Sequence, residues 1–414
     1  MPEFLTLLPP NEAREKLFSH LPVPEPASEL IEVAVSLGRV TTEDIRAPHP
    51  LPDFRRSTVD GFAVRAKDTY GASDSLPAYL ALVGEVPMGD APEAALQPGQ
   101  CMTIHTGGML PDGADAVVML EYTQAAREGE LEIFKSVAEG ENVIAIGEDV
   151  AHGQVVQPKG SLMRPAEIGG LMALGIVRLR VTKKMRVGLI SSGDEVIPPS
   201  ESPRPGQVRD VNSFTLGALV EKSGGEPIYY GIVGDSFEKL KASAARALTE
   251  CEAVIITAGS SASTRDMTAD VIDQLGQPGV LVHGINTRPG KPTILGVCAG
   301  KAVIGLPGNP VSALVNGYML VVPLIERLLG QRPRPKAAVQ AKLTVNLPSQ
   351  AGREDWWPVK LIENHQLENA NFAAEPIFGK SNLIFTLAAA DGLLRILPDA
   401  TGLSAGEMVE VFLV

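Results

Sequence analysis

Acidic residues and Gly-Ser loops follow several predicted parallel strands between residues 187 and 330. They lie in four short loops, at 191–195, 234–235, 259–266 and 305–310. In an open α/β sheet, ligands bind beyond the carboxyl ends of the strands, so these loops should converge on one cleft. Backbone N–H groups of such loops bind phosphate, and carboxylates suit a hard cation. The pattern predicts a Mg²⁺-assisted site for a phosphorylated substrate.

Each polar residue of these loops also has a purely structural interpretation. Asp266 precedes a predicted helix over 267–275 and fits its N-cap, and Asp-Ser-Phe-Glu at 235–238 has the spacing of a capping box. Glu195 fits an ordinary loop acid, and Asn309 fits an N-cap before Pro310. Singly these signals are weak. Their convergence at one sheet edge favours the functional interpretation.

Several common catalytic motifs are absent. No two glycines have the Gly-x-Gly spacing of a dinucleotide-binding fingerprint. Residues 284–291 resemble a P-loop but have one residue too many, and Pro292 stands where Ser or Thr should bind Mg²⁺. Residues 259–263 lack the second glycine of a nucleophile elbow, and no Cys/His cluster has zinc spacing.

The composition fits a cytoplasmic enzyme. A net charge of −13 argues against a nucleic-acid binder. Three widely spaced cysteines indicate buried free thiols in a reducing compartment. Residues 1–18 have no apolar core of a signal peptide, and the apolar run at 311–325 is too short to span a bilayer. We therefore expect no membrane contact and a buried helix at 311–325.

Changes in residue composition and periodicity along the chain predict four domains. Leu30, Val33, Ala34 and Leu37 recur at helical spacing, and helical character returns near 165–174. We therefore predict a discontinuous N-terminal domain (1–47 plus 150–182) around a β-rich projecting insert (48–149). Strands and helices alternate at 183–331, which predicts a doubly wound α/β domain. Residues 332–414, which begin with an Arg-Pro-Arg-Pro linker, are predicted to form a β-rich C-terminal domain.

Several longer sequence motifs resemble those of a known protein family. They are Ser-Thr-Val-Asp-Gly-Phe-Ala at 57–63, His-Thr-Gly at 105–107, Pro-Asp-Gly-Ala-Asp at 111–115, Gly-Glu-Asn at 140–142, Gly-Glu-Asp at 147–149, Ser-Gly-Asp-Glu at 192–195, Arg-Pro-Gly-Lys-Pro at 288–292 and Gly-Leu-Pro-Gly-Asn-Pro-Val-Ser-Ala at 305–313. In this order they resemble the molybdopterin molybdenumtransferase family, of the MoeA and gephyrin E-domain type. The match runs over nearly the whole chain.

The resemblance implies a multidomain α/β plus β fold, with a molybdopterin-binding α/β domain and a C-terminal β-barrel. It implies an elongated homodimer that transfers molybdate into adenylylated molybdopterin with release of AMP, dependent on Mg²⁺. The molybdopterin adenylyltransferase and downstream molybdoenzymes are the candidate protein partners. Molybdate and tungstate are tetrahedral oxyanions of similar size, so both remain open as the metal source.

The resemblance also assigns residues to the site. Asp266, Asp235 and Glu195 are the expected Mg²⁺ ligands, and Arg288, Arg353 and Ser381 the molybdate donors, with Lys291 as phosphate partner. Asp60, Thr106 and Asp149 match catalytic positions on the projecting domain that reach the partner subunit's cleft. The other expected substrate-binding residues are Gly259, Ser260, Ser261, Ser263, Pro307, Gly308, Asn309 and Ser312.

Two departures and two rival functions remain open at this point. The loop at 258–263 reads Ala-Gly-Ser-Ser-Ala-Ser where the family shows more glycine, and Arg288 stands where it shows lysine. A Mg²⁺-dependent pyrophosphatase or nucleotide hydrolase could use the same cleft. A non-catalytic, gephyrin-like scaffold could bind a peptide on the C-terminal domain, although the intact acids at 195, 235 and 266 argue against it.

Overall fold

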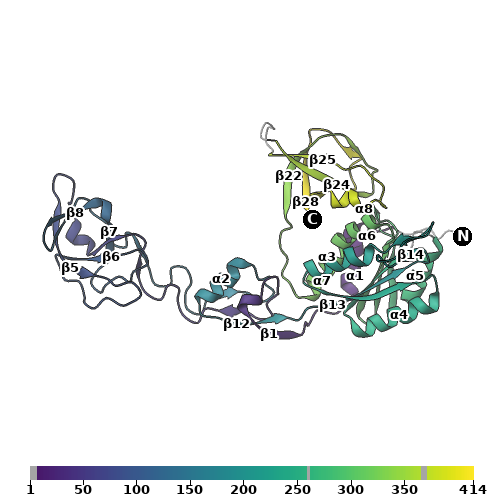
Figure 1. The fold of residues 1–414 in the computed structure, drawn as a ribbon, viewed down its shortest axis with the longest axis horizontal. Helices are drawn as coiled ribbons and strands as arrows, with labels where there is room; N and C mark the ends of the chain where they lie inside the picture. The colour runs from purple at the N-terminus through teal and green to yellow at the C-terminus, as the bar shows by residue number, and fades with distance from the viewer. Residues whose placement is uncertain (1–6, 259–261, 365–370) are drawn as a thin grey trace.

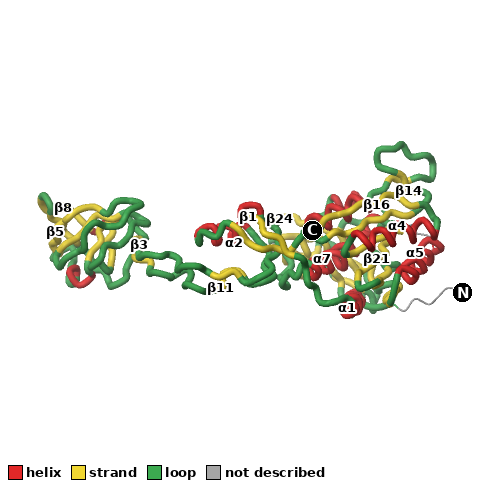
Figure 2. Tube along the Cα trace, turned by 90° about the horizontal axis from the view of Figure 1, so that it is seen from below, coloured by secondary structure: helices red, strands yellow, loops and turns green. Residues whose placement is uncertain are grey.

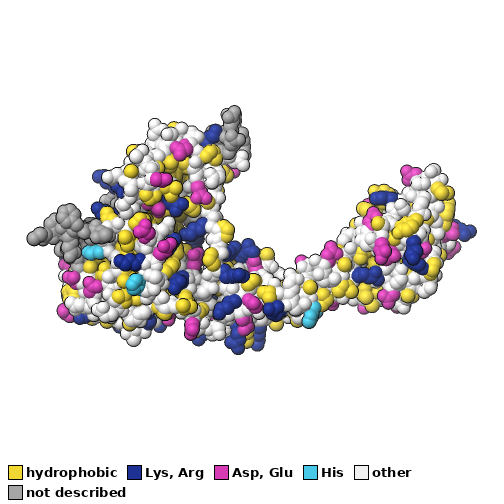
Figure 3. Space-filling view, turned by 180° about the vertical axis from the view of Figure 1, so that it is seen from behind, with side chains coloured by type: hydrophobic (Ala, Val, Ile, Leu, Met, Phe, Trp, Pro, Cys, Tyr) yellow, Lys and Arg dark blue, Asp and Glu magenta, His cyan; other side chains and the backbone are white. Residues whose placement is uncertain are grey.

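The computed structural model describes residues 7–258, 262–364 and 371–414, and for residues 262–266 the backbone alone. The molecule is elongated. A compact body carries the C-terminal domain on top, and a narrow neck connects the body to a separate β-rich lobe (Figures 1 and 3).

Two distant segments of chain close around one small core in the middle of the molecule. Strand β1 (Ser28–Glu32) pairs antiparallel with β12 (Arg178–Thr182), and β2 (Ile45–Arg46) pairs with β11 (Val155–Gln157). The helix α2 (Pro165–Ala173) adds to a core of Val33, Met163, Leu171, Leu179 and Val181. This arrangement places the first and third sequence segments together, on either side of the inserted lobe.

The N-terminal segment differs from its prediction in two ways. The expected helix through Leu30 and Leu37 is instead strand β1 followed by the 3₁₀ turn η1 (Val33–Val35), because pairing with β12 outweighs the helical spacing. The helix α1 (Pro10–His20) packs on the α/β sheet, where Ala13 and Leu17 are buried in the main core. Residues 1–47 are therefore shared between two domains.

The projecting lobe is built on a six-stranded sheet in the order β7-β4-β6-β5-β9-β8. Its strands are β4 (Gly61–Val64), β5 (Ala78–Glu85), β6 (Gln100–Ile104), β7 (Ala116–Met119), β8 (Thr123–Arg127) and β9 (Glu130–Ile133), with the turns η2 (Ala66–Thr69) and η3 (Leu120–Tyr122). The neck consists of two chain passes joined by β3 (Arg56–Ser57) with β10 (Val143–Ile144) and by a bridge between Leu51 and Val150 (Figure 2).

The body contains a mixed six-stranded sheet in the order β16-β13-β17-β21-β20-β18. Four strands are parallel, namely β13 (Arg186–Ser192), β16 (Glu226–Val233), β17 (Ala253–Ala258) and β21 (Lys301–Pro307). Strand β20 (Ile294–Cys298) runs in the opposite direction and pairs antiparallel with β21 on one side and with the edge strand β18 (Pro278–His283) on the other. The predicted alternating α/β domain is confirmed, with one antiparallel strand, β20, inside the sheet.

Helices cover both faces of this sheet, as a doubly wound domain requires. One face packs against α4 (Phe237–Glu250) and α5 (Ala262–Leu275). The other packs against α1, α3 (Asn212–Lys222) and the long apolar helix of α6 (Pro310–Asn316), the π-helical turn η4 (Gly317–Val321) and α7 (Val322–Leu328). That helix is long and apolar enough to cross a membrane, but 61% of it is buried in the protein, as expected of a core helix.

The C-terminal domain is a closed barrel. Strands β24 (Glu354–Glu363), β25 (Phe372–Pro376), β22 (Ala338–Leu343), β28 (Met408–Leu413) and β26 (Gly392–Ile396) pair in that order, and β26 closes the ring on β24. The short pair β23 (Leu347–Pro348) and β27 (Gly402–Leu403) and the helix α8 (Ile384–Ala388) complete it. The predicted C-terminal β-barrel is confirmed.

One short strand joins the body to the barrel. The α/β domain contributes β19 (Thr287–Arg288), which pairs in parallel with the start of β24, so that Arg288 lies opposite Asp355. Backbone hydrogen bonds therefore fix the two domains against each other next to the carboxyl edge of the sheet.

Candidate active site

A cavity of about 500 Å³ lies at the carboxyl edge of the parallel strands. It is lined by Ser191 and Ser192 from the end of β13, Thr257 from β17, and Gly308 and Asn309 after β21. We call it the strand-edge cavity. Glu195, Asp210, Asn212, Arg209, Asn382 and Ile384 lie among its other lining residues. Of the four loops predicted at this edge, those at 191–195 and 305–310 line this cavity, whereas 234–235 does not line it and the side chains of 259–266 lie outside the described residues.

Polar atoms of the strand-edge cavity lack protein partners. The buried Ser192 Oγ and Asn212 Oδ1 have no hydrogen-bond partner among the described residues. The Asn212 amide donates its Nδ2 to the Gly308 carbonyl at 2.9 Å, which holds that side chain at the cavity. Buried polar groups without partners are costly, so these atoms mark a place for a polar ligand.

Three carboxylates lie beside this cavity, on the loops after β13 and β16. Asp194 accepts a hydrogen bond from the Asp235 backbone at 3.0 Å, and Gly193 adopts a φ of +143° that lets the Glu195 carboxylate fold back over it. Burial, and then the charges of Asp194 and Glu195, raise the pKa of Asp235. Such a donor set suits a divalent cation, whose charge would relieve this repulsion. No group of three metal-ligating side chains is close enough to form a complete site among the residues whose side chains are described.

The capping interpretations of the two aspartates are wrong. The helix α4 begins at Phe237 after Ser236, and no side chain caps it. The helix α5 begins at Ala262, so Asp266 is its fifth residue and cannot be the N-cap. Before α3 the N-cap residue is Val211, and the preceding Asp210 accepts a hydrogen bond from the Ser213 backbone at 3.1 Å. Asp235 and Asp266 therefore have no capping role to explain them.

A second cavity, of about 700 Å³, lies between the α/β domain and the barrel. Among the described residues, its lining holds four cationic side chains, Arg288, Lys291, Arg353 and Lys380, and no carboxylate. We call it the basic cavity. Pro307, Ser312, Ser381, Trp356 and Trp357 also line it, and Asn309 and Asn382 line both cavities. The two cavities are thus neighbours along one cleft, one beside acids and the other surrounded by cations.

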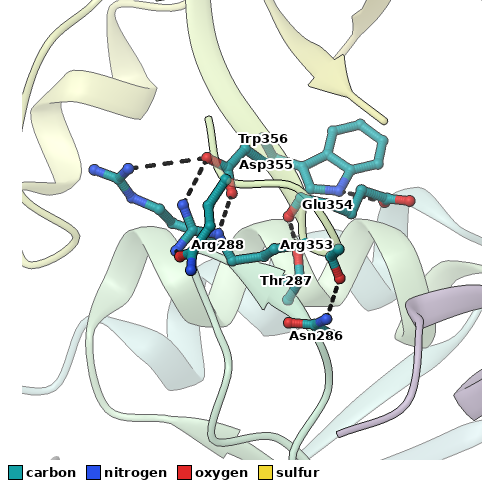
Figure 4. A network of polar contacts seen from close by, with 9 residues as sticks. Asn286, Thr287, Arg288, Arg353, Glu354, Asp355 and Trp356 are labelled. Atoms are coloured by element: carbon teal, nitrogen blue, oxygen red, sulfur yellow. Dashed lines mark hydrogen bonds and ion pairs between the residues drawn. The ribbon is translucent and has the colours of Figure 1, made fainter. Parts of the chain in front are cut away.

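Two arginines of the basic cavity contact the same buried aspartate, Asp355 (Figure 4). The Arg353 guanidinium donates Nε to Asp355 Oδ1 at 2.6 Å and Nη2 to Oδ2 at 3.0 Å. The Arg288 Nη1 lies 3.9 Å from Asp355 Oδ2, and its guanidinium stacks over the Trp357 ring at 5.3 Å. Arg353 is therefore held by a bidentate contact before any ligand arrives, and Arg288 lies beside the same carboxylate.

The loop that carries Arg288 and Lys291 is attached to the long apolar helix. The buried Asn316 side chain donates Nδ2 to the Gly290 carbonyl at 2.9 Å. Gly290 has a φ of +105°, and an added Cβ would lie 2.2 Å from Asn316 Nδ2. Only glycine fits this close approach. The glycine of the Pro-Gly-Lys-Pro motif is therefore required for the backbone conformation that positions Lys291.

The loop at 305–310 binds the barrel. Asn309 stands at the N-cap position of α6 but makes no capping hydrogen bond; it donates Nδ2 to Ser381 Oγ at 3.1 Å instead. The Val311 backbone donates to the Ser381 carbonyl at 3.0 Å. Asn309 therefore connects the substrate loop to the barrel.

The projecting lobe carries a separate polar group. Asp60 accepts hydrogen bonds from the Thr106 backbone at 2.7 Å and from the Thr106 hydroxyl at 3.1 Å, and His105 Nδ1 lies 3.7 Å away. Asp149 lies in the neck. The neck separates Asp60 and Thr106 from both cavities of the same chain (Figure 1). These three residues do not join the cleft of their own subunit.

The contacts of Asp60 predict a pH effect. Hydrogen bonds from Thr106, and then the charge of His105, hold the pKa of Asp60 below its usual range. A depressed folded-state pKa stabilises the fold above the unfolded-state pKa, and this stabilisation is lost as the pH falls through the folded value. Thr106→Val should therefore destabilise the lobe more at pH 7 than at an acidic pH at which Asp60 is protonated. Thermal unfolding at the two pH values measures this difference, and equal losses at both would contradict it.

Five of the expected substrate or metal residues cannot be placed. Gly259, Ser260 and Ser261 lie outside the described residues, and so do the side chains of Ser263 and Asp266. Sequence reasoning missed Asp355, Asp194, Trp357 and Asn382. Asp194 belongs to the Ser-Gly-Asp-Glu word and could have been found there. No sequence pattern indicates that Asp355 belongs to the site, because its neighbours on β24 are typical of a half-buried strand.

Comparison with known proteins agrees with this architecture. Residues 8–175 match the MoeA N-terminal region (domain I and II), residues 188–327 the probable molybdopterin binding domain, and residues 340–414 the MoeA C-terminal region (domain IV). The chain belongs to the MoeA family. Its predicted class, a transferase of molybdenum cofactor biosynthesis, is thereby confirmed.

Relatives match over almost their whole length. A putative molybdopterin biosynthesis protein of Methanocaldococcus jannaschii is 36% identical, with 96% of this chain and 95% of the relative covered. The molybdopterin molybdenumtransferase of Haemophilus influenzae is 32% identical, with 97% of each covered. A crystal structure of a molybdopterin biosynthesis MoeA protein from Pyrococcus horikoshii OT3 is 32% identical, covers 99% of this chain and 100% of that chain, and has a TM-score of 0.85.

Proposed function

We propose that this MoeA-family enzyme inserts molybdate into adenylylated molybdopterin and releases AMP, in the cytoplasm and with Mg²⁺. The main support is the basic cavity, whose described lining residues include four cations and no carboxylate and which shares Asn309 and Asn382 with the strand-edge cavity. A dianionic oxyanion suits the basic cavity, and a phosphorylated pterin suits the strand-edge cavity. Adjacent sites would hold the two reactants together, which is the main requirement of a transfer reaction.

The residues divide into two groups by chemistry. On the pterin nucleotide side, Ser192 and Asn212 offer unpartnered polar atoms, and the loop with Gly308 and Asn309 lies at the end of β21. On the oxyanion side, Arg353 and Arg288 are anchored donors, and the Ser381 hydroxyl accepts from Asn309 and can donate its own proton. Lys291, exposed on the cavity wall, would bind phosphate as a point charge.

The proposed Mg²⁺ ligands are Glu195, Asp235 and Asp266. Glu195 and Asp235 repel each other electrostatically in this structure, which fits a cation between them. When bound, Mg²⁺ neutralises charge that develops as the phosphoanhydride breaks. Added Mg²⁺ should raise the melting temperature at pH 7, because it relieves this repulsion.

We further propose that the site is completed in a homodimer. Asp60, Thr106 and Asp149 lie on the lobe and neck, away from the cleft of their own chain (Figure 1). The length of the neck would let one subunit's lobe reach the other's cleft. The molybdopterin adenylyltransferase, which would supply the substrate, and the molybdoenzymes, which would receive the product, are the proposed transient partners.

Arg353→Ala tests the oxyanion side. Loss of a charge-assisted hydrogen bond should raise the molybdate concentration for half-maximal AMP release by about one to two orders of magnitude. Binding of the pterin nucleotide should stay within about twofold of wild type, since Arg353 lines only the basic cavity. Weakened pterin binding with unchanged molybdate dependence would place Arg353 on the other side of the site.

A further inference from the structure

The basic cavity is supported by a carboxylate that is not exposed to it. Asp355 is fully buried, and its side chain does not line the cavity. Both of its oxygens accept hydrogen bonds from one arginine, Arg353, and one of them also faces a second arginine, Arg288 (Figure 4).

The β19–β24 pairing explains why this carboxylate can be buried. An isolated buried carboxylate is costly, but a bidentate arginine fork satisfies both oxygens. Arg353 directly precedes β24, and Arg288 lies opposite Asp355 across the parallel register. One aspartate on the barrel therefore joins an arginine from each domain.

The anchored faces of the two arginines leave other donors for a ligand. Nη1 of Arg353 has only a long contact of 3.4 Å with Gln350, and Arg288 keeps its side chain 54% exposed over the Trp357 ring. Long cationic side chains lose rotamer entropy when they bind a ligand, so prior anchoring lowers the cost of binding. Two guanidinium groups and one carboxylate also leave a net charge of about +1 before the lysines are counted.

We propose that Asp355 is a positioning residue for the oxyanion: it holds Arg353 and Arg288 as a rigid pair of donors for molybdate. This inference rests on the function proposed above. Asp355 does not touch the substrate, so its removal acts through the arginines. The effect should therefore fall on molybdate affinity and not on the pterin nucleotide.

The test measures molybdate-dependent AMP release by the full-length enzyme and its variants. Asp355→Asn should raise the half-saturating molybdate concentration about tenfold, the effect of losing one charge-assisted hydrogen bond, with the maximal rate and the KM for adenylylated molybdopterin nearly unchanged. The double variant Asp355→Asn with Arg353→Ala should be less impaired than the sum of the two single effects predicts, because the part of the Asp355 effect that acts through Arg353 is already lost and only the part through Arg288 remains. Additive effects, or a wild-type molybdate dependence in Asp355→Asn, would overturn the inference.

Glu354→Gln is the matched control. Glu354 is the adjacent buried acid of β24, but it accepts a hydrogen bond from Trp356 Nε1 at 2.7 Å and lines a different cavity. Its variant should keep the wild-type molybdate dependence. An equal rise in both variants would show that any buried acid of β24 matters only for the fold.

If Asp355→Asn does not fold, Arg353→Lys tests the positioning role of Asp355 instead. Lysine keeps the charge but cannot form the fork, so a positioned pair predicts a half-saturation close to that of Arg353→Ala. A value close to wild type would overturn the inference. If wild-type enzyme releases AMP without any molybdate dependence, the proposed function fails, whatever the variants do.

Discussion

Asp235→Asn is expected to lower AMP release by roughly a hundredfold or more while the melting temperature stays the same or rises, since a metal's stabilisation of developing charge is worth several kcal/mol. The fold should not suffer, because burial and the charges of Asp194 and Glu195 raise the pKa of Asp235. An acid whose folded-state pKa is raised destabilises the fold as the pH rises through that value. Neutral asparagine removes this repulsion at pH 7.

Parallel activity and thermal unfolding measurements check this divergence. Glu238→Gln is the control, because Glu238 lies in the first turn of α4, the helix that follows the Asp235 loop, and lines neither cavity. It should change neither quantity. The metal role of Asp235 would be refuted by normal turnover in Asp235→Asn, and a fall in melting temperature parallel to activity would make the residue structural.

Mixed dimers of Asp60→Ala and Asp235→Asn are expected to recover about a quarter of wild-type activity, although each variant alone is nearly inactive. If the lobe of one subunit serves the cleft of the other, a mixed dimer has one cleft with both lesions and one with none. Random pairing makes about half of the dimers mixed, each with one of two sites intact. Activity after mixing and re-equilibration, with mass spectrometry of the dimers, measures the recovery.

Mixing Asp60→Ala with Thr106→Val is the matched control. Both residues lie on the lobe and hydrogen-bond each other, so every cleft of that mixed dimer carries one lesion. Its activity should not exceed the average of the two homodimers measured separately. Absence of recovery in the first mixture, once heterodimers are detected, would mean that Asp60 does not complete the partner's site.

The sequence predicted the parts of the site that depend on short local sequence motifs. The loops after β13 and β21 meet at the sheet edge because strand order and direction follow from the alternating pattern. Arg288, Lys291, Arg353 and Ser381, carried by the resemblance, line one cavity. Their positions depend on motifs that contain glycine and proline, which permit only a few backbone conformations.

Contacts between distant elements could not be predicted in this way. The strand β19 pairs with the barrel across the domain boundary, and neither its two residues nor Asp355 has a pattern that indicates this partner. The N-terminal region shows the same limit, since Leu30 and Val33 have helical spacing but the strand that contains Leu30 pairs with β12. Tertiary pairing outweighs local propensity where the segment is short. The helix start at Ala262 was missed for a related reason: Ala-Ser-Thr-Arg resembles a loop, although it extends α5.

Molybdenum loading per AMP released is the measurement that tests the central claim most directly. Adenylylated molybdopterin, Mg²⁺ and enzyme are incubated without oxygen, with and without molybdate, and AMP and pterin-bound molybdenum are quantified. Molybdate insertion predicts little AMP without molybdate and one molybdenum atom bound to the pterin for each AMP released with it. Equal AMP release in both samples, with no molybdenum on the pterin, would contradict it and identify a nucleotide hydrolase.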